Sequence, residues 1–199
     1  MISSLPVSQL APLDYRYAID GALALLGNVR PLVRCEQPEL DAELAQRLPV
    51  SDYMQHTIYP SAALWIEPQQ VNWQQVLNTL ATTLPPGTQL AIIASQPLAR
   101  LLPDRQTWRG VPIGIKPGGI TRLGNGLRRA GFYVQAKYGI HSVYAIGLNS
   151  LGGLMTRIGR ADLRDRLEFA ARLGYMTHGV AMPLATVALV LACKKATVV

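Results

Sequence analysis

Apolar residues in this chain gather in short continuous runs separated by amphipathic stretches. Two runs, 61–67 and 89–95, have the pattern of strands buried on both faces, and a shorter strand is expected over 31–36. Between the two longer runs, apolar positions at helical spacing predict a helix over 71–84, which Pro85-Pro86-Gly87 ends. Strand–helix–strand units of this length indicate right-handed crossovers and a parallel sheet.

The remaining periodic stretches predict further elements. Helices are expected over 20–27, 39–46 and 121–130, and strands over 131–138 and 184–193. The elements therefore alternate along most of the chain, as they do in an α/β protein.

The stretch 140–180 predicts a helical insertion before the last strand, with helices over 143–158 and 161–173. The first helix is apolar over much of its circumference, and the second is amphipathic with mixed charges on its outer face. Such an insertion fits a lid over the sheet edge, the contact of a homodimer, or a contact with a membrane surface. The mixed charges favour the lid or dimer element over the membrane contact.

The composition fits one domain over residues 1–199, because hydrophobic residues make up 49% of the chain and charged residues 16%. The sequence contains no run of about 18 apolar residues, so no transmembrane segment is expected. The first residues lack the features of a signal peptide, so we expect a cytoplasmic protein. Two cysteines and three scattered histidines match no metal-ligand spacing, so no metal is expected.

The net charge is +7, and most of the excess follows residue 99. No long uninterrupted basic run occurs, so a nucleic-acid-binding tail is not supported. An Arg-rich surface for anionic lipid or nucleic acid is a lower-ranked interpretation of the second half.

Two stretches of the chain resemble motifs of one enzyme family. Residues 62–67, the helix after them, Leu84-Pro-Pro-Gly-Thr88 and residues 90–94 resemble the fourth strand, helix and fifth strand of the class I S-adenosylmethionine (SAM) methyltransferases. Leu127-Arg-Arg-Ala-Gly-Phe132 is similar to that family's entry to its sixth strand. The resemblance implies an α/β fold with a doubly wound, mostly parallel sheet of methyltransferase (Rossmann-like) type, an antiparallel last strand and a shortened third-strand region.

The same resemblance directs attention to residues 13–21. In the family, the first strand ends in an acid and a turn of alternating glycines, and Leu13-Asp14 is similar to that strand end. Arg16, Ala18 and Asp20 fall at or near the glycine positions, and Gly21 is the single glycine. Side chains there narrow backbone access to SAM, and Asp20 brings a negative charge towards the cofactor's carboxylate, which Arg16 could offset.

Three further acids have counterparts implied by the resemblance. Glu36 resembles the residue that binds both ribose hydroxyls, with a solvated strand end as the alternative, and Asp52 resembles the acid near the adenine amino group. Glu67 ends the expected fourth strand, on the edge where ligands bind in open α/β sheets.

Four residues are candidates for contacts with a substrate, because they lie near the expected ligand-binding edge of the sheet or in the insertion. The candidates are Trp65, Trp73, His141 and Tyr144. Trp73 also suits a core anchor, and the isolated histidines suit structural or surface roles. No residue is assigned a catalytic role.

Two functions follow from these features. The first is a methyltransferase-like protein with weakened or lost SAM binding that serves as a binding or scaffold module, with a homodimer through 140–180. The alternative is an active SAM-dependent methyltransferase for a small-molecule or lipid-like acceptor.

Overall fold

The computed structural model describes residues 13–27, 29, 31–35, 61–66, 73–96, 119–173, 176–177 and 184–196. Their centre is a six-stranded sheet in the order β1-β2-β3-β6-β4-β5. The strands are β1 (Leu32–Cys35), β2 (Ala62–Ile66), β3 (Gln89–Ser95), β4 (Phe132–Ser142), β5 (Met176–Thr177) and β6 (Ala185–Lys194). The first three are parallel, whereas β6 runs antiparallel to both β3 and β4, and β5 runs antiparallel to β4.

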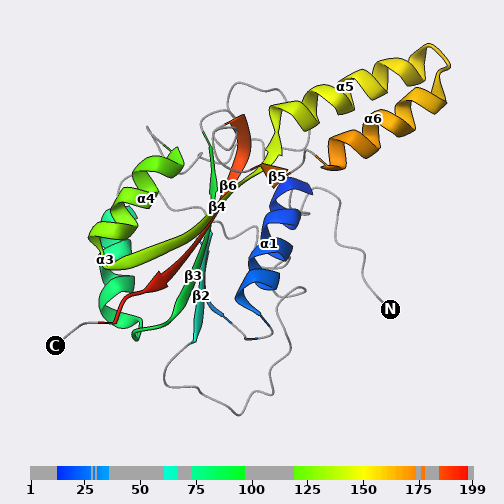
Figure 1. Ribbon diagram of the computed structural model, residues 1–199. Helices are drawn as coiled ribbons and strands as arrows, with labels where there is room; N and C mark the ends of the chain where they lie inside the picture. The colour runs from blue at the N-terminus through cyan, green and yellow to red at the C-terminus, as the bar shows by residue number, and fades with distance from the viewer. Residues whose placement is uncertain are drawn as a thin grey trace.

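Helices cover both faces of this sheet. Figure 1 shows α1 (Leu13–Leu26) on one face and α3 (Trp73–Thr83) and α4 (Gly119–Arg129) on the other. Alternate residues of β3 point to opposite faces, so Leu90 and Ile92 pack in the α3–α4 core while Ala91 and Ile93 pack in the α1 core. The predicted doubly wound, mostly parallel α/β sheet with an antiparallel last strand is therefore confirmed.

Several predicted bounds shift by a few residues. The expected strand 131–138 continues to Ser142, and the expected helix 71–84 is observed as Trp73–Thr83. The expected helix 39–46 and the shortened third-strand region lie outside the described residues.

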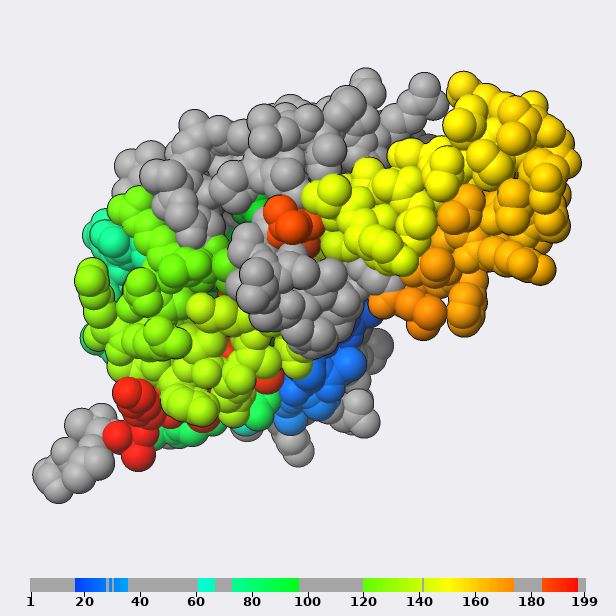
Figure 2. Space-filling model, turned by 45° about the horizontal axis from the view of Figure 1, so that its top comes forward, coloured from blue at the N-terminus to red at the C-terminus, as the bar shows by residue number. Residues whose placement is uncertain are grey.

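The two helices of the expected insertion are confirmed as α5 (Val143–Arg157) and α6 (Ala161–Leu173). They form an antiparallel hairpin that extends beyond the body of the protein (Figure 2). Gly159, with a φ of 78°, makes the left-handed turn between them. None of the helices in the described part of the chain is long and apolar enough to cross a membrane.

Close packing of α3 against α4 depends on Gly126. A Cβ at this position would lie 2.6 Å from Cζ3 of Trp73, whose ring is buried between the helices and the sheet. Gly153 on α5 provides a contrast, because a Cβ there would meet no atom within 4 Å.

We expect Gly126→Ala to lower the free energy of unfolding by about 1–3 kcal/mol, because the buried indole of Trp73 has to shift. Gly153→Ala should instead raise it by about 0.5–1 kcal/mol through improved helix propensity. Urea denaturation of the two variants measures the difference, and equal stabilisation by both would contradict this packing.

Candidate functional site

The strand pairing identifies which strand stands at the topological switch point. In a doubly wound sheet of order 3-2-1-4-5-6, the first strand lies beside the fourth, and ligands bind outside the carboxyl ends of these strands. The expected fourth strand is β2, and its parallel neighbour is β1, with Cys35 paired to Ile66 at the carboxyl ends. Thus β1, which the sequence had suggested as the second strand, takes the position of the first.

The prediction that residues 13–21 form a turn after the first strand is wrong. These residues lie in the helix α1, which begins at Leu13 and precedes β1. Its apolar positions Ala18, Ile19, Ala22 and Leu26 follow helical spacing and are buried against the sheet. Burial of this face stabilises a helix through Tyr, Asp and Gly residues that locally suit a turn.

The five predicted cofactor residues of this stretch therefore share one helix. Ala18 is fully buried in the core, Gly21 is partly buried and Asp20 is exposed. The side chains of Asp14 and Arg16 lie outside the described part of the structure. The turn on which their cofactor role depended is absent from the described α1 segment, whose residues are helical throughout.

Three predicted acids, Glu36, Asp52 and Glu67, lie outside the described residues. In the sequence, however, Glu36 comes directly after β1 and Glu67 directly after β2. Cys35 and Ile66 are paired at the carboxyl ends of β1 and β2. In the sequence, a glutamate is therefore the next residue after each of two neighbouring strands. The expected ribose role of Glu36 belongs to an acid after the second strand, whereas β1 pairs with β2 as the first strand of that order does, so this role stays a prediction.

The two predicted substrate tryptophans are buried. Trp65, on β2, is 1% exposed and Trp73, at the start of α3, is 4% exposed, and both belong to the α3–α4 core. Nε1 of Trp65 has no hydrogen-bond partner among the described residues. An unpaired buried N–H costs about 1–3 kcal/mol, so this indole is a donor that a ligand or water near the end of β2 would satisfy.

The other two substrate candidates lie where β4 passes into α5. Tyr144 is 59% exposed on the first turn of the helix, and the side chain of His141 lies outside the described residues. Between them, the buried Ser142 caps α5, because its Oγ accepts a hydrogen bond from the N–H of Ala145 at 3.2 Å. The structure thus separates Tyr144, which follows β4, from Trp65 on β2, because β3 and β6 lie between these two strands.

Sequence reasoning missed a group of buried polar residues at the carboxyl edge of β3 and β4. These residues are Ser95, Gln96, Ser142 and Thr186. They are adjacent because the N–H of Gln96 donates to the carbonyl of Thr186 at 2.7 Å, and Ser142 is paired with Ala185. Thr186 Oγ1 also donates to the carbonyl of Ile140 at 3.4 Å. Only the pairing of β6 with both neighbours reveals the group, since its members are far apart in the sequence.

Comparisons with known proteins give distant structural likenesses. No protein-family model and no curated protein sequence matches this chain. The CcbJ methyltransferase from Streptomyces caelestis is similar at 10% identity and a TM-score of 0.48, over 97% of this chain and 94% of its own. The SpnF cyclase is similar at 17% identity and a TM-score of 0.42, over 92% and 81% of the two chains. Because these TM-scores are below 0.5, the fold description depends on the strand order and directions of this chain.

We expect Ser142→Ala to lower the free energy of unfolding by about 1 kcal/mol, because the first turn of α5 loses its cap. The control is Thr156→Ala, which removes a hydroxyl bonded to the carbonyl of Gly152 at 3.1 Å on an exposed part of the same helix. This change should stay within about 0.5 kcal/mol of the original protein. Thermal and urea denaturation measure both effects, and an equal loss in the two variants would contradict the capping role.

Proposed function

We propose that this protein is a methyltransferase-like binding module in which the affinity for SAM is weakened or lost. The observation that carries the proposal is the pairing of β1 with β2, which makes the connection after Cys35 the counterpart of the family's glycine turn. That connection begins Glu36-Gln-Pro-Glu-Leu-Asp41, and the chain has no glycine between Gly27 and Gly87.

The chemistry of this connection disfavours a bound SAM. Glycines after the first strand permit a tight turn and a close approach of backbone N–H groups to the ligand. A Cβ at each position restricts that approach, and Pro38 has no N–H to donate. Three acids within residues 36–41 also disfavour the carboxylate of SAM at short range.

The alternative is an active SAM-dependent methyltransferase that acts on a small-molecule or lipid-like acceptor. Glu36 favours it, because an acid directly after the first strand is what the resemblance implies for the family. The indole N–H of Trp65, which has no hydrogen-bond partner in the described part of the chain, also offers a donor near the end of β2. The described part of the structure contains no group of three metal-ligating side chains.

Thermal unfolding in the presence of SAM distinguishes the two functions. A cofactor with a Kd of about 10 μM, added at about 1 mM, stabilises a protein by about 2.7 kcal/mol. For a chain of this size, that stabilisation raises Tm by about 5–11 °C. We expect neither SAM nor S-adenosylhomocysteine to raise Tm by more than about 1 °C, which corresponds to a Kd near or above the ligand concentration.

Calorimetry provides the second readout for this prediction. Micromolar binding of either compound would overturn the proposal and favour the active enzyme, provided that Glu36→Gln weakens the binding. Glu168→Gln, on the hairpin, is the matched control because it removes the same charge far along the chain from β1.

We further propose that the α5–α6 hairpin is the docking element of this module and that a second copy of the chain occupies it. Within these helices only Ala145, Gly152 and Ala171 are fully buried. Seven of the twelve large apolar residues that are exposed in the described structure lie on the hairpin: Val143, Tyr144, Leu151, Leu154, Ile158, Phe169 and Leu173. Two helical hairpins associate readily as a four-helix bundle, which buries the apolar residues that one hairpin leaves exposed.

The charges of the hairpin are compatible with self-association. Arg164 donates through Nε to Glu168 Oε1 at 2.6 Å, and this bond raises the pKa of the guanidinium. Arg160 similarly contacts Asp162 at 3.3 Å. Because Arg160 and Arg164 have acidic partners on the hairpin itself, these two charges do not require an acidic partner protein.

We expect the protein to have the mass of a dimer in light scattering after size-exclusion chromatography. Leu154→Glu and Phe169→Glu should each shift it to the monomer, because a charge in the apolar contact must be desolvated. Tyr133→Glu is the control, since Tyr133 is 62% exposed on β4, outside the hairpin. A monomeric original protein would contradict this assembly, as would equal dissociation by Tyr133→Glu.

A further inference from the structure

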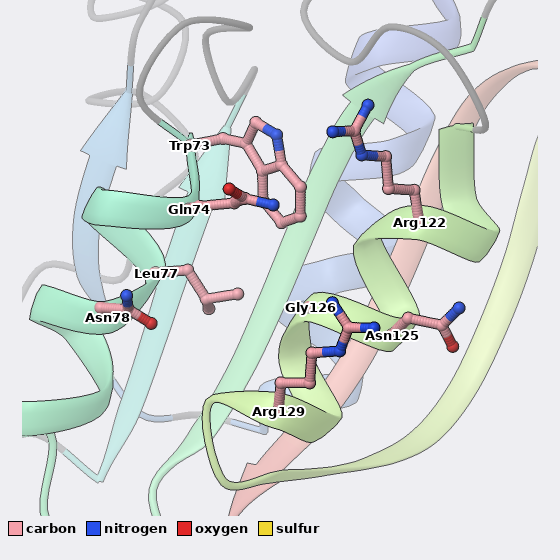
Figure 3. Close-up of a pocket in the computed structure, with 8 residues that line it drawn as sticks. All are labelled: Trp73, Gln74, Leu77, Asn78, Arg122, Asn125, Gly126 and Arg129. Carbon is pink, nitrogen blue, oxygen red and sulfur yellow. The ribbon is translucent and has the colours of Figure 1, made fainter.

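A pocket of about 440 Å³ lies between α3 and α4, apart from the switch point at β1 and β2. Figure 3 shows Trp73 of α3 and Arg122 of α4 on facing sides of it, whereas the side chain of Asn125 points away from α3. From α3 come Trp73, Gln74 and Asn78, and from α4 come Arg122, Asn125 and Arg129. Among the described residues that line this pocket, Trp73 is the only one that the sequence predicts as a site residue.

The spacing of the polar residues explains why they line one pocket. Arg122, Asn125 and Arg129 are three and four residues apart, so they lie on one face of α4. Gln74 and Asn78 are four residues apart and lie on one face of α3. The contact of Trp73 with Gly126 holds the helices close together and forms the apolar end of the pocket.

The described residues around the pocket carry charge of one sign. Among the described residues of the sheet centre and this helix layer (61–66, 73–96, 119–142 and 184–196) there is no Asp or Glu. The same ranges contain six basic residues, namely Arg122, Arg128, Arg129, Lys137, Lys194 and Lys195. Burial and the charge of Arg128 lower the pKa of Lys137 from its ordinary value, as expected for a cation in a region with excess positive charge.

We propose that this pocket binds a small molecule through an anionic phosphate group. A guanidinium presents its donors in a planar fork that matches phosphate oxygens, and the neighbouring amides of Asn125, Gln74 and Asn78 supply further hydrogen bonds. The volume lies within the range of about 300–1,000 Å³ that is typical of small-molecule sites.

The distance between the arginines favours an extended anion over a single phosphate ion. Arg122 and Arg129 are seven residues apart, which corresponds to about 10.5 Å along the helix axis, with Asn125 between them. A diphosphate or a phosphate ester with a polar body reaches both guanidinium groups. A long polyanion such as RNA would instead also contact Arg128 and Lys137, which do not line the pocket.

Isothermal titration calorimetry with pyrophosphate tests the proposal. We expect Arg122→Gln and Arg129→Gln each to raise the Kd about 10-fold, because each removes a charge-assisted hydrogen-bond donor. Arg128→Gln, on the same turn of α4, is the matched control and should change the Kd less than about 2-fold, because it alters only the surrounding field. Melting temperatures of the variants establish that each remains folded.

A second pair of variants tests the pocket without removing an arginine. Asn125→Asp places a carboxylate of nearly the same shape on the pocket lining, between Arg122 and Arg129 along α4, and we expect it to raise the Kd for pyrophosphate at least about 10-fold. Asn149→Asp makes the same change at an exposed position of α5 and should leave the Kd unchanged.

Flotation with phosphatidylcholine vesicles, with and without phosphatidic acid, distinguishes a lipid phosphate from a soluble one. Binding to either source supports the proposal if it depends on Arg129 and Asn125 but not on Arg128. Absence of pyrophosphate and vesicle binding would overturn the proposal. It would also be overturned if single-stranded RNA bound and Arg128→Gln weakened that binding as much as Arg129→Gln.

Discussion

The insertion of β6 between β3 and β4 is the constraint on which the rest of this structure depends. Residues Ala185 to Ala192 are buried without exception, because one side of the strand packs under α3 and α4 and the other under α1. Backbone bonds between Lys194 and the turn at Gly87 and Thr88, each 2.9 Å, continue the pairing beyond β3. A slip of one residue would exchange the two faces of β6, so its register fixes both cores together.

The direction of β6 also determines where buried polar residues gather. Since β6 runs against its neighbours, its first residues meet the last residues of β3 and β4, and the buried polar group around Gln96 and Thr186 forms there. The hairpin leaves the sheet at the same end, through Ser142. The α3–α4 pocket lies on a helix layer instead, so the proposed anion site and the proposed loss of SAM binding at β1 concern different parts of the fold. A protein that kept the α/β fold but not the glycine turn would retain such surfaces for binding.

The sequence predicted the central elements well because their signals are local. The run 89–95 matches β3 at both ends, and both hairpin helices agree with the structure within one residue. The stretch from Leu13 was assigned wrongly because Asp14, Tyr15 and Gly21 suit a turn, whereas burial of Ala18 and Ile19 against a distant sheet decides for a helix. The identity of β1 as the strand beside β2 depends on tertiary pairing, as does the convergence of Arg122 and Gln74, and neither has a local signal.

The central claim is that a methyltransferase-like sheet here stands without a functional SAM site at its switch point. A crystal structure of the protein grown with millimolar S-adenosylhomocysteine tests it most directly. We predict a pairing of Cys35 with Ile66 as described and no ligand density beside the carboxyl ends of β1 and β2. Well-defined S-adenosylhomocysteine bound at that edge would contradict the account.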